Sequence, residues 1–148
     1  METKLPSIQD LTADTYGTNA LMVLLNQPPP SGWLKEHPMI KVGGKPLKYI
    51  PRERLEYLLC RIYTKWHLEI KSVQLIANSV CVCVRLHVTN PLTGQEEWND
   101  GIGAQPLQTD KGAGATDFNS IKSNAVQIGA PAAETYAFKD ACEKFGKL

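Results

Sequence analysis

The side chains best suited to chemistry lie on one short segment, residues 79–88, with the sequence SVCVCVRLHV. Every second residue from Val80 is valine or leucine, and the residues between them include Arg85 and His87. A period of two is typical of a β-strand and places the two kinds of side chain on opposite faces. We therefore expect a core strand whose other face offers cationic groups to an anionic ligand.

The thiols and imidazole of this segment could be considered as metal ligands, since Cys81, Cys83 and His87 share a face. A strand rises about 3.3 Å per residue, so Cys81 and His87 are roughly 20 Å apart, too far for one ion. The four cysteines are at 60, 81, 83 and 142, and the spacing of Cys81 and Cys83 on one strand face suits neither a disulfide nor a CxxC site. We expect no metal site and reduced thiols, as in a cytoplasmic protein.

Catalytic motifs are equally sparse. Glu96, Glu97 and Asp100 lie near one predicted strand and supply about the number of carboxylates that a metal-dependent nuclease needs. The sequence contains no GxSxG or HExxH motif, and GIGAQP at 101–106 lacks the GK[ST] ending of a phosphate-binding loop. We therefore expect no catalytic residues and no enzyme activity, with a nuclease-like metal enzyme as an open alternative.

Basic residues are more informative, although the chain is nearly neutral. Sixteen lysines and arginines against fifteen carboxylates give a net charge of +1, so an anion-binding surface must gather its charge locally. The basic residues near predicted elements are Lys45, Lys48, Arg52, Arg54, Arg85, Lys139, Lys144 and Lys147. Converging on one groove, they would follow a phosphate backbone, with Tyr49, Tyr63 or Trp66 available for stacking.

These residues require a scaffold, and the composition is that of one globular domain. The chain has 148 residues, of which 43% are hydrophobic and 21% charged. It shows no secretory signal and no apolar run near the roughly 18 residues of a membrane helix, which favours a soluble cytoplasmic protein.

Helices are predicted before and after the strands along the chain. A short helix over 19–26 ends before the prolines at 28–30, and residues 31–48 predict an irregular arm with turns at Gly43-Gly44 and Pro46. Pro51 suits the start of a helix. Its apolar stripe is Leu55, Leu58, Leu59, Ile62 and Trp66. A last helical zone begins at Ser120; Pro131 breaks or kinks it and opens a final helix with the stripe Ala137, Ala141, Phe145 and Leu148.

Strands over 68–76, 79–88 and 95–103 are joined by turns at 77–78 and 90–94, and a loop follows over 104–118. The predicted class is α+β: a helix, a three-stranded antiparallel meander and a long C-terminal helix. We expect one compact domain, with an N-terminal arm over 1–44 and a core over 45–148.

Five features in a fixed order carry a family resemblance: Lys48-Tyr49-Ile50-x-x-x-Arg54, Trp66, VCVCVR at 80–85, DGIG at 100–103, and Ala141-x-x-x-Phe145-Gly146. This order resembles the Rad fifty-two superfamily of single-strand annealing proteins, most closely the phage annealing recombinases of the Sak-like type. The likeness covers residues 45–148. It implies a curved sheet, assembly into rings or filaments, and a basic groove that holds single-stranded DNA with its bases free to pair, without ATP or another cofactor.

The resemblance also implies site residues. Arg54 matches a groove-lining arginine, and Lys139 matches a residue of the long helix that contacts the DNA backbone. An aromatic residue before the tryptophan has two candidate matches, Tyr63 and Lys65. The complete predicted DNA-binding set is Lys48, Arg54, Tyr63, Lys65, Arg85, Lys139 and Lys144. Two further basic positions of the family are acidic here, Asp140 and Glu143.

The expected function is DNA strand annealing in recombination and repair, by a phage or prophage protein in the cytoplasm or nucleoid of a bacterial host. The expected partners are single-stranded DNA, further copies of the chain, and a single-strand binding protein reached through a C-terminal tail that this chain lacks. A monomeric DNA-binding module without annealing activity is a second alternative.

Overall fold

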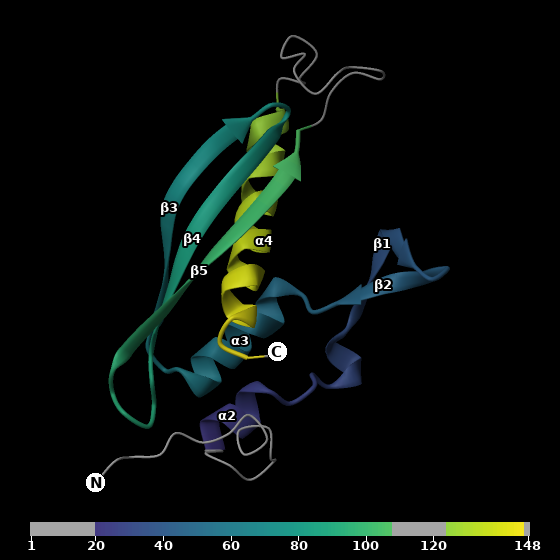
Figure 1. Ribbon diagram of the computed structural model, residues 1–148. Coiled ribbons are helices and arrows are strands. Elements are labelled where there is room, and N and C mark those ends of the chain that lie inside the picture. Colours follow the sequence, from purple (N-terminus) through teal and green to yellow (C-terminus); the bar gives the residue numbers. More distant parts are fainter. Residues whose placement is uncertain (1–19, 108–123, 147–148) are drawn as a thin grey trace, which may run out of the picture.

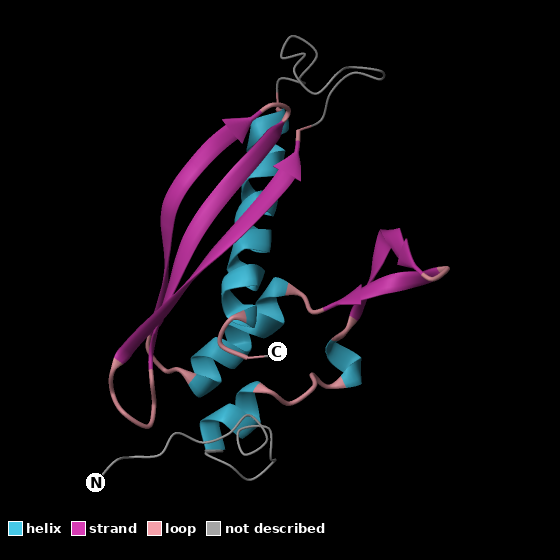
Figure 2. Cartoon of the chain, viewed as in Figure 1, coloured by secondary structure: helices cyan, strands magenta, loops and turns pink. Residues whose placement is uncertain are grey.

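The computed structural model describes residues 20–107 and 124–146, and these form an α+β fold. One long helix lies along a three-stranded antiparallel sheet, and a separate two-stranded hairpin projects beside them (Figures 1 and 2). In chain order the elements are α2 (Ala20–Leu25), η1 (Ser31–Trp33), β1 (Lys35–Val42), β2 (Lys45–Tyr49), α3 (Arg52–Ile62), β3 (Trp66–Ile76), β4 (Ser79–Thr89), β5 (Glu96–Pro106) and α4 (Ala125–Glu143). Among the described helices, none is long and apolar enough to cross a membrane.

The centre of the sheet is β4, and its side chains alternate as predicted. The set Val80, Val82, Val84, Leu86 and Val88 is fully buried beneath α4, while the residues between them are partly exposed on the other face. Strands β3 and β5 pair antiparallel with β4 on either side, so the predicted meander is confirmed. The turn between β3 and β4 uses Ala77 at φ 54°. Strand β5 reaches Pro106, so the loop predicted over 104–118 begins too early; residues 108–118 lie outside the described part.

Helix α4 approaches the sheet closely because small residues meet at the contact. Ala133, Ala137 and Ala141 pack on Gly101 and Gly103 of β5, where an added Cβ would collide with the helix backbone. The prediction that Pro131 opens a new helix is wrong, since α4 is continuous through it. Pro131 is exposed, so water can solvate the carbonyl that its missing N–H leaves free. The predicted stripe is confirmed at Ala137 and Ala141, and Leu148 lies outside the described residues.

Helix α3 begins after Pro51, as predicted, and buries Leu55 and Leu59. It ends at Ile62, so the assignment of Trp66 to its stripe is wrong; Trp66 is the first residue of β3. The indole still joins the core, because its ring lies 6.2 Å from that of Phe138 on α4. Arg52 fastens α3 to α4 by donating to both carboxylate oxygens of Glu134.

The irregular arm predicted over 31–48 is instead mostly a β-hairpin. Gly43 and Gly44 take φ values of +59° and +78°, the left-handed pair that suits a two-residue hairpin turn, so this turn is confirmed. Pro46 lies within β2 and marks no turn. Most side chains of both strands are exposed, so burial leaves no alternating pattern in the sequence. The boundary expected at residue 44 falls inside this hairpin. The short helix predicted over 19–26 is confirmed as α2.

Candidate nucleic-acid interface

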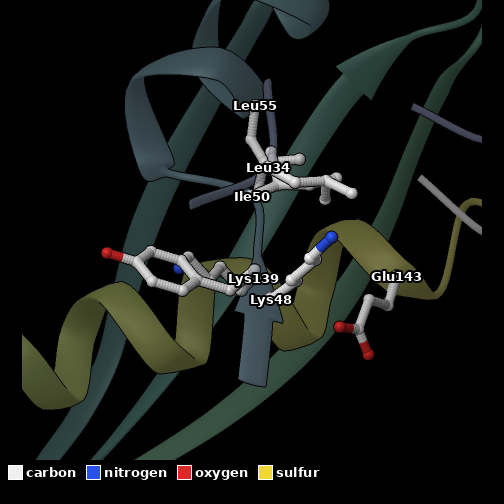
Figure 3. A pocket seen from close by; sticks show the side chains of 7 residues that line it. Leu34, Lys48, Ile50, Leu55, Lys139 and Glu143 are labelled. Carbon is white, nitrogen blue, oxygen red and sulfur yellow. The ribbon is translucent and has the colours of Figure 1, made fainter. Parts of the chain in front are cut away.

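A trough runs between the β1–β2 hairpin and α4, and we call it the hairpin trough. Its first part is a hollow of about 320 Å³ lined by Leu34, Lys48, Tyr49, Ile50, Leu55, Lys139 and Glu143. Figure 3 shows that Lys48 and Lys139 come from β2 and α4, elements far apart in the chain. Two of the predicted DNA-binding residues therefore meet in one hollow.

Lys139 is held over an aromatic surface in this hollow. Its Nζ lies 4.7 Å from the centroid of the Tyr49 ring, within reach of a cation–π interaction. Burial lowers the pKa of Lys139, while the nearby carboxylates of Glu53 and Glu143 act in the opposite direction. No carboxylate among the described residues lies within 4.0 Å of its ammonium group, so this charge is open to an added anion.

The second part of the trough is apolar. A hollow of about 540 Å³ continues past Tyr49 and Lys139, which line both parts. The other lining residues are His37, Pro38, Ile40 and Leu47 of the hairpin and Ala132, Thr135 and Tyr136 of α4. Tyr136 is 45% exposed, so its ring is accessible to a planar ligand.

Sequence reasoning missed this apolar part. A signal was present for Tyr136, which precedes Lys139 by three residues on the same predicted helix and therefore shares its side. Nothing comparable pointed to Ile40 or Leu47, because the hairpin itself was not predicted.

The trough does not contain Arg54 or Tyr63. Arg54 is exposed on α3, with its guanidinium carbon 5.3 Å from the centroid of the Trp33 ring. Tyr63 is only 1% exposed, and burial raises its pKa to about 12. Tyr63, predicted to contact DNA, is closed to a ligand in this chain, because its buried ring packs against Phe145.

Arg85 lies on the open face of the sheet, away from α4. Its neighbours Val84 and Leu86 must face the helix, so strand alternation turns Arg85 to the other side. The guanidinium donates to Asp100 at 2.7 and 3.0 Å and lies 3.7 Å from the centroid of the Trp98 ring. Arg85, expected to converge on one groove with Lys139, therefore does not share the hairpin trough with it.

His87 occupies the same open face and is clasped by two carboxylates. Its Nε2 lies 2.9 Å from Glu69 of β3, and its Nδ1 lies 2.7 Å from Glu96 of β5. The hydrogen bonds with Glu69 and then Glu96 raise the pKa of His87 and favour the imidazolium. His67 stacks on the ring at 4.2 Å. Lys65 lies beside this group, lining a small hollow with His87 and Glu96 at the end of the sheet, and does not reach the trough.

Lys144 also lies outside the trough. Its ammonium contacts the carbonyl oxygen of Asp100 and lies 3.4 Å from the carboxylate of Asp140. Asp140 in turn accepts the backbone N–H of Ile102 at 3.0 Å. The two side chains thus satisfy backbone groups at the outer edge of β5. Asp140 and Glu143 are the two acidic residues at positions where the resemblance implies basic ones. Asp140 binds the edge of β5, and Glu143 lines the trough.

The carboxylates considered for a nuclease are dispersed. Glu96 pairs with His87, Asp100 pairs with Arg85, and Glu97 accepts from the side chain of Asn90. In the part of the chain that the structure describes, no three His, Cys, Asp or Glu side chains are placed to share a metal ion. The geometry does not favour this alternative.

No protein-family model matches the chain, and a search of curated proteins found no match. A functional assignment therefore depends on the residues and their geometry.

Proposed function

We propose that the protein binds single-stranded DNA in the hairpin trough and promotes annealing of complementary strands. The observation that carries this proposal is the meeting of Lys48 and Lys139 beside Tyr49 and Tyr136. Ammonium groups neutralise phosphates, and exposed rings stack on bases without regard to sequence. A trough with one cationic and one apolar part suits a single DNA strand, which has charged phosphates on one side and aromatic bases on the other.

Annealing in this proposal needs no bond-breaking residue and no ATP. The free energy comes from base pairing, and the protein lowers the entropic cost of the encounter by holding one strand extended. The motif order that resembles the Rad fifty-two superfamily supports the same activity. We place the protein in recombination and repair of phage or prophage DNA, in the cytoplasm or nucleoid of a bacterial host.

Assembly of several copies is part of the proposal. Ile70, Val73 and Leu75 of β3 lie on the same side of the sheet as the buried valines, yet each is more than half exposed. Helix α4 packs over β4 and β5 and leaves this strip uncovered. A second copy covering it would bury apolar area and extend the trough from subunit to subunit.

The test is binding of a labelled oligothymidylate, about 30 nucleotides long, as a function of salt. We expect Lys139→Gln and Lys48→Gln each to weaken binding several-fold and to reduce the slope of log K against log salt by about 0.7, the value for one phosphate contact on a single strand. The charge-matched control is Lys71→Gln, on β3 and remote from the trough lining. Wild-type affinity and slope in both trough variants would exclude this site.

Annealing itself is measured with complementary fluorescent strands in EDTA. We expect full activity without metal, whereas its loss would favour the enzyme alternative. A stable monomer that binds DNA but does not accelerate annealing would favour the monomeric module.

A further inference from the structure

The outward face of α3 carries a row of arginine and aromatic side chains, which we call the arginine–aromatic ladder. Its members are Trp33 of η1 and Arg54, Tyr57 and Arg61 of α3. The guanidinium carbon of Arg54 lies 5.3 Å from the centroid of the Trp33 ring, and that of Arg61 lies 5.2 Å from the centroid of the Tyr57 ring. The two rings meet edge to face, with centroids 6.1 Å apart.

Helical spacing puts the ladder on the side of α3 that does not face the core. Arg54, Tyr57 and Arg61 follow at i, i+3 and i+7, which is one stripe of a helix. Leu55 and Leu59 form the buried side. Tyr57 is 45% exposed, so packing within the described chain does not account for the ladder.

The two arginines of the ladder have no ion-pair partner within the described residues. The sequence has four arginines, and two of them, Arg52 and Arg85, are paired with carboxylates. Arg54 and Arg61 make no ion pair within 4.0 Å across residues 20–107 and 124–146. Each instead has its guanidinium carbon over an aromatic ring, within reach of a cation–π interaction. Such a contact brings no carboxylate to the guanidinium, whose N–H donors can bind an oxyanion in a bidentate manner.

The ladder adjoins the cationic part of the hairpin trough. Leu34 and Leu55 line that part, and their chain neighbours are Trp33 and Arg54. At this junction Lys35 pairs with Glu53 at 3.1 Å. The charge of the Glu53 carboxylate also favours a higher pKa of Lys139, against the effect of burial. A strand leaving the trough beside Lys139 would therefore reach the ladder next.

We propose that the ladder is a second contact for the same single strand, with Arg54 and Arg61 binding phosphates and Tyr57 stacking on a base. This inference rests on the proposed function. It extends the binding site to Trp33, Tyr57 and Arg61, three residues that no motif of the sequence indicated.

The experiment is the salt titration with an oligothymidylate of about 30 nucleotides, longer than the roughly 4–16 that one small binding domain covers. We expect Arg61→Gln to weaken binding several-fold and to reduce the salt slope by about 0.7. Arg61→Lys should keep the slope and lose part of the affinity, because an ammonium keeps the charge without the planar donors. Tyr57→Ala should lower affinity with the slope unchanged. Lys71→Gln is the charge-matched control, and circular dichroism establishes that each variant is folded.

The outcomes separate this inference from the proposed function. Wild-type behaviour of Arg61→Gln and Tyr57→Ala, with weakened Lys48→Gln and Lys139→Gln, would overturn the ladder and leave the trough standing. Absence of oligothymidylate binding by the wild type would overturn both. Ladder variants that lose binding to polyglutamate but not to oligothymidylate would assign the ladder to an acidic protein partner and overturn the proposal.

Discussion

At the scale of single residues, charge in this protein is divided between two settings. On the open face of the sheet, Arg85 is satisfied by Asp100 and His87 by two glutamates, so these groups join strands to one another. Around the trough and on α3, Lys139, Arg54 and Arg61 lie over aromatic rings, and none has a carboxylate within 4.0 Å among the described residues. The first group serves the fold, and the second is available to a ligand.

The His87 clasp predicts a pH-dependent stability. The folded pKa of His87 is raised above its ordinary value near 6.5. The contribution of His87 to stability is therefore present below pH 6.5 and is lost as pH rises through the folded pKa. The folded pKa of Glu69 is lowered, so the contribution of Glu69 to stability is lost as pH falls through its folded pKa. We expect His87→Gln to be destabilising near pH 5.5 and nearly neutral near pH 9.

The measurement is urea unfolding of wild type and variant across this range. A pH-independent effect of His87→Gln would show that the clasp has no electrostatic role.

At the scale of elements, the closeness of α4 and β5 governs the architecture. Gly101 and Gly103 leave room for the helix backbone, and Asp140 and Lys144 satisfy the outer edge of β5. The outer edge of β3 has no such cover from α4. A bulge between Ile70 and Ser72 interrupts the pairing of β3 with β4. One edge of the sheet is thus closed by the chain's own helix, while no helix or strand of the described residues pairs with the other edge.

Gly101→Ala tests the helix–sheet contact. The added Cβ would collide with backbone atoms of Ala137 and Ala141, which cannot move aside as a flexible side chain could. We expect a loss of about 1–3 kcal/mol in the free energy of unfolding, the usual cost of overpacking. Gly32→Ala is the matched control, since nothing lies within 4 Å of its added Cβ. Equal stability of the two variants in urea unfolding would contradict the close contact.

Val84→Asp tests the orientation of β4. Val84 has no exposed area, so the carboxylate would be buried without a partner and we expect the protein not to fold. Cys83→Asp, one residue earlier and partly exposed on the open face, is the control and should fold. A folded Val84→Asp variant by circular dichroism would mean that the faces are reversed.

At the scale of the whole molecule, one chain places its cationic residues on separate sides. Lys48 and Lys139 share the trough, Arg54 and Arg61 lie on α3, and Arg85 lies across the sheet. Among the described residues, the DNA path that we propose within one chain therefore follows the trough and α3. A longer path requires neighbouring copies, for which the uncovered strip of β3 is the proposed contact.

Val73→Lys tests this contact. A charge in the centre of the strip should oppose burial, so we expect sedimentation velocity to show a shift from larger species towards the 16.4 kDa chain. Gln74→Lys adds the same charge on the opposite face of β3 and should leave the distribution unchanged. If both variants sediment like the wild type, the strip is not the contact.

Local patterns in the sequence were sufficient for most of the core. The alternation in 79–88 predicted β4 and its buried face, and Leu55 and Leu59 predicted the inner side of α3. Both predictions were possible because an element buried on one side has apolar residues spaced at its own structural period, about two residues for a strand and about 3.6 for a helix. The hairpin escaped prediction because most of its side chains are exposed, so only its glycine turn left a trace.

The site depended on tertiary structure. Lys48 and Lys139 are 91 positions apart, and only the packing of α4 beside the hairpin brings them together. Contact with Phe145 closes Tyr63 to a ligand, and the approach of α4 to β5 assigns Asp140 to the edge of that strand. Periodicity states which side of its own element a residue occupies. Which side chains become neighbours is decided by contacts between distant elements, and these leave no periodic signal in a single sequence.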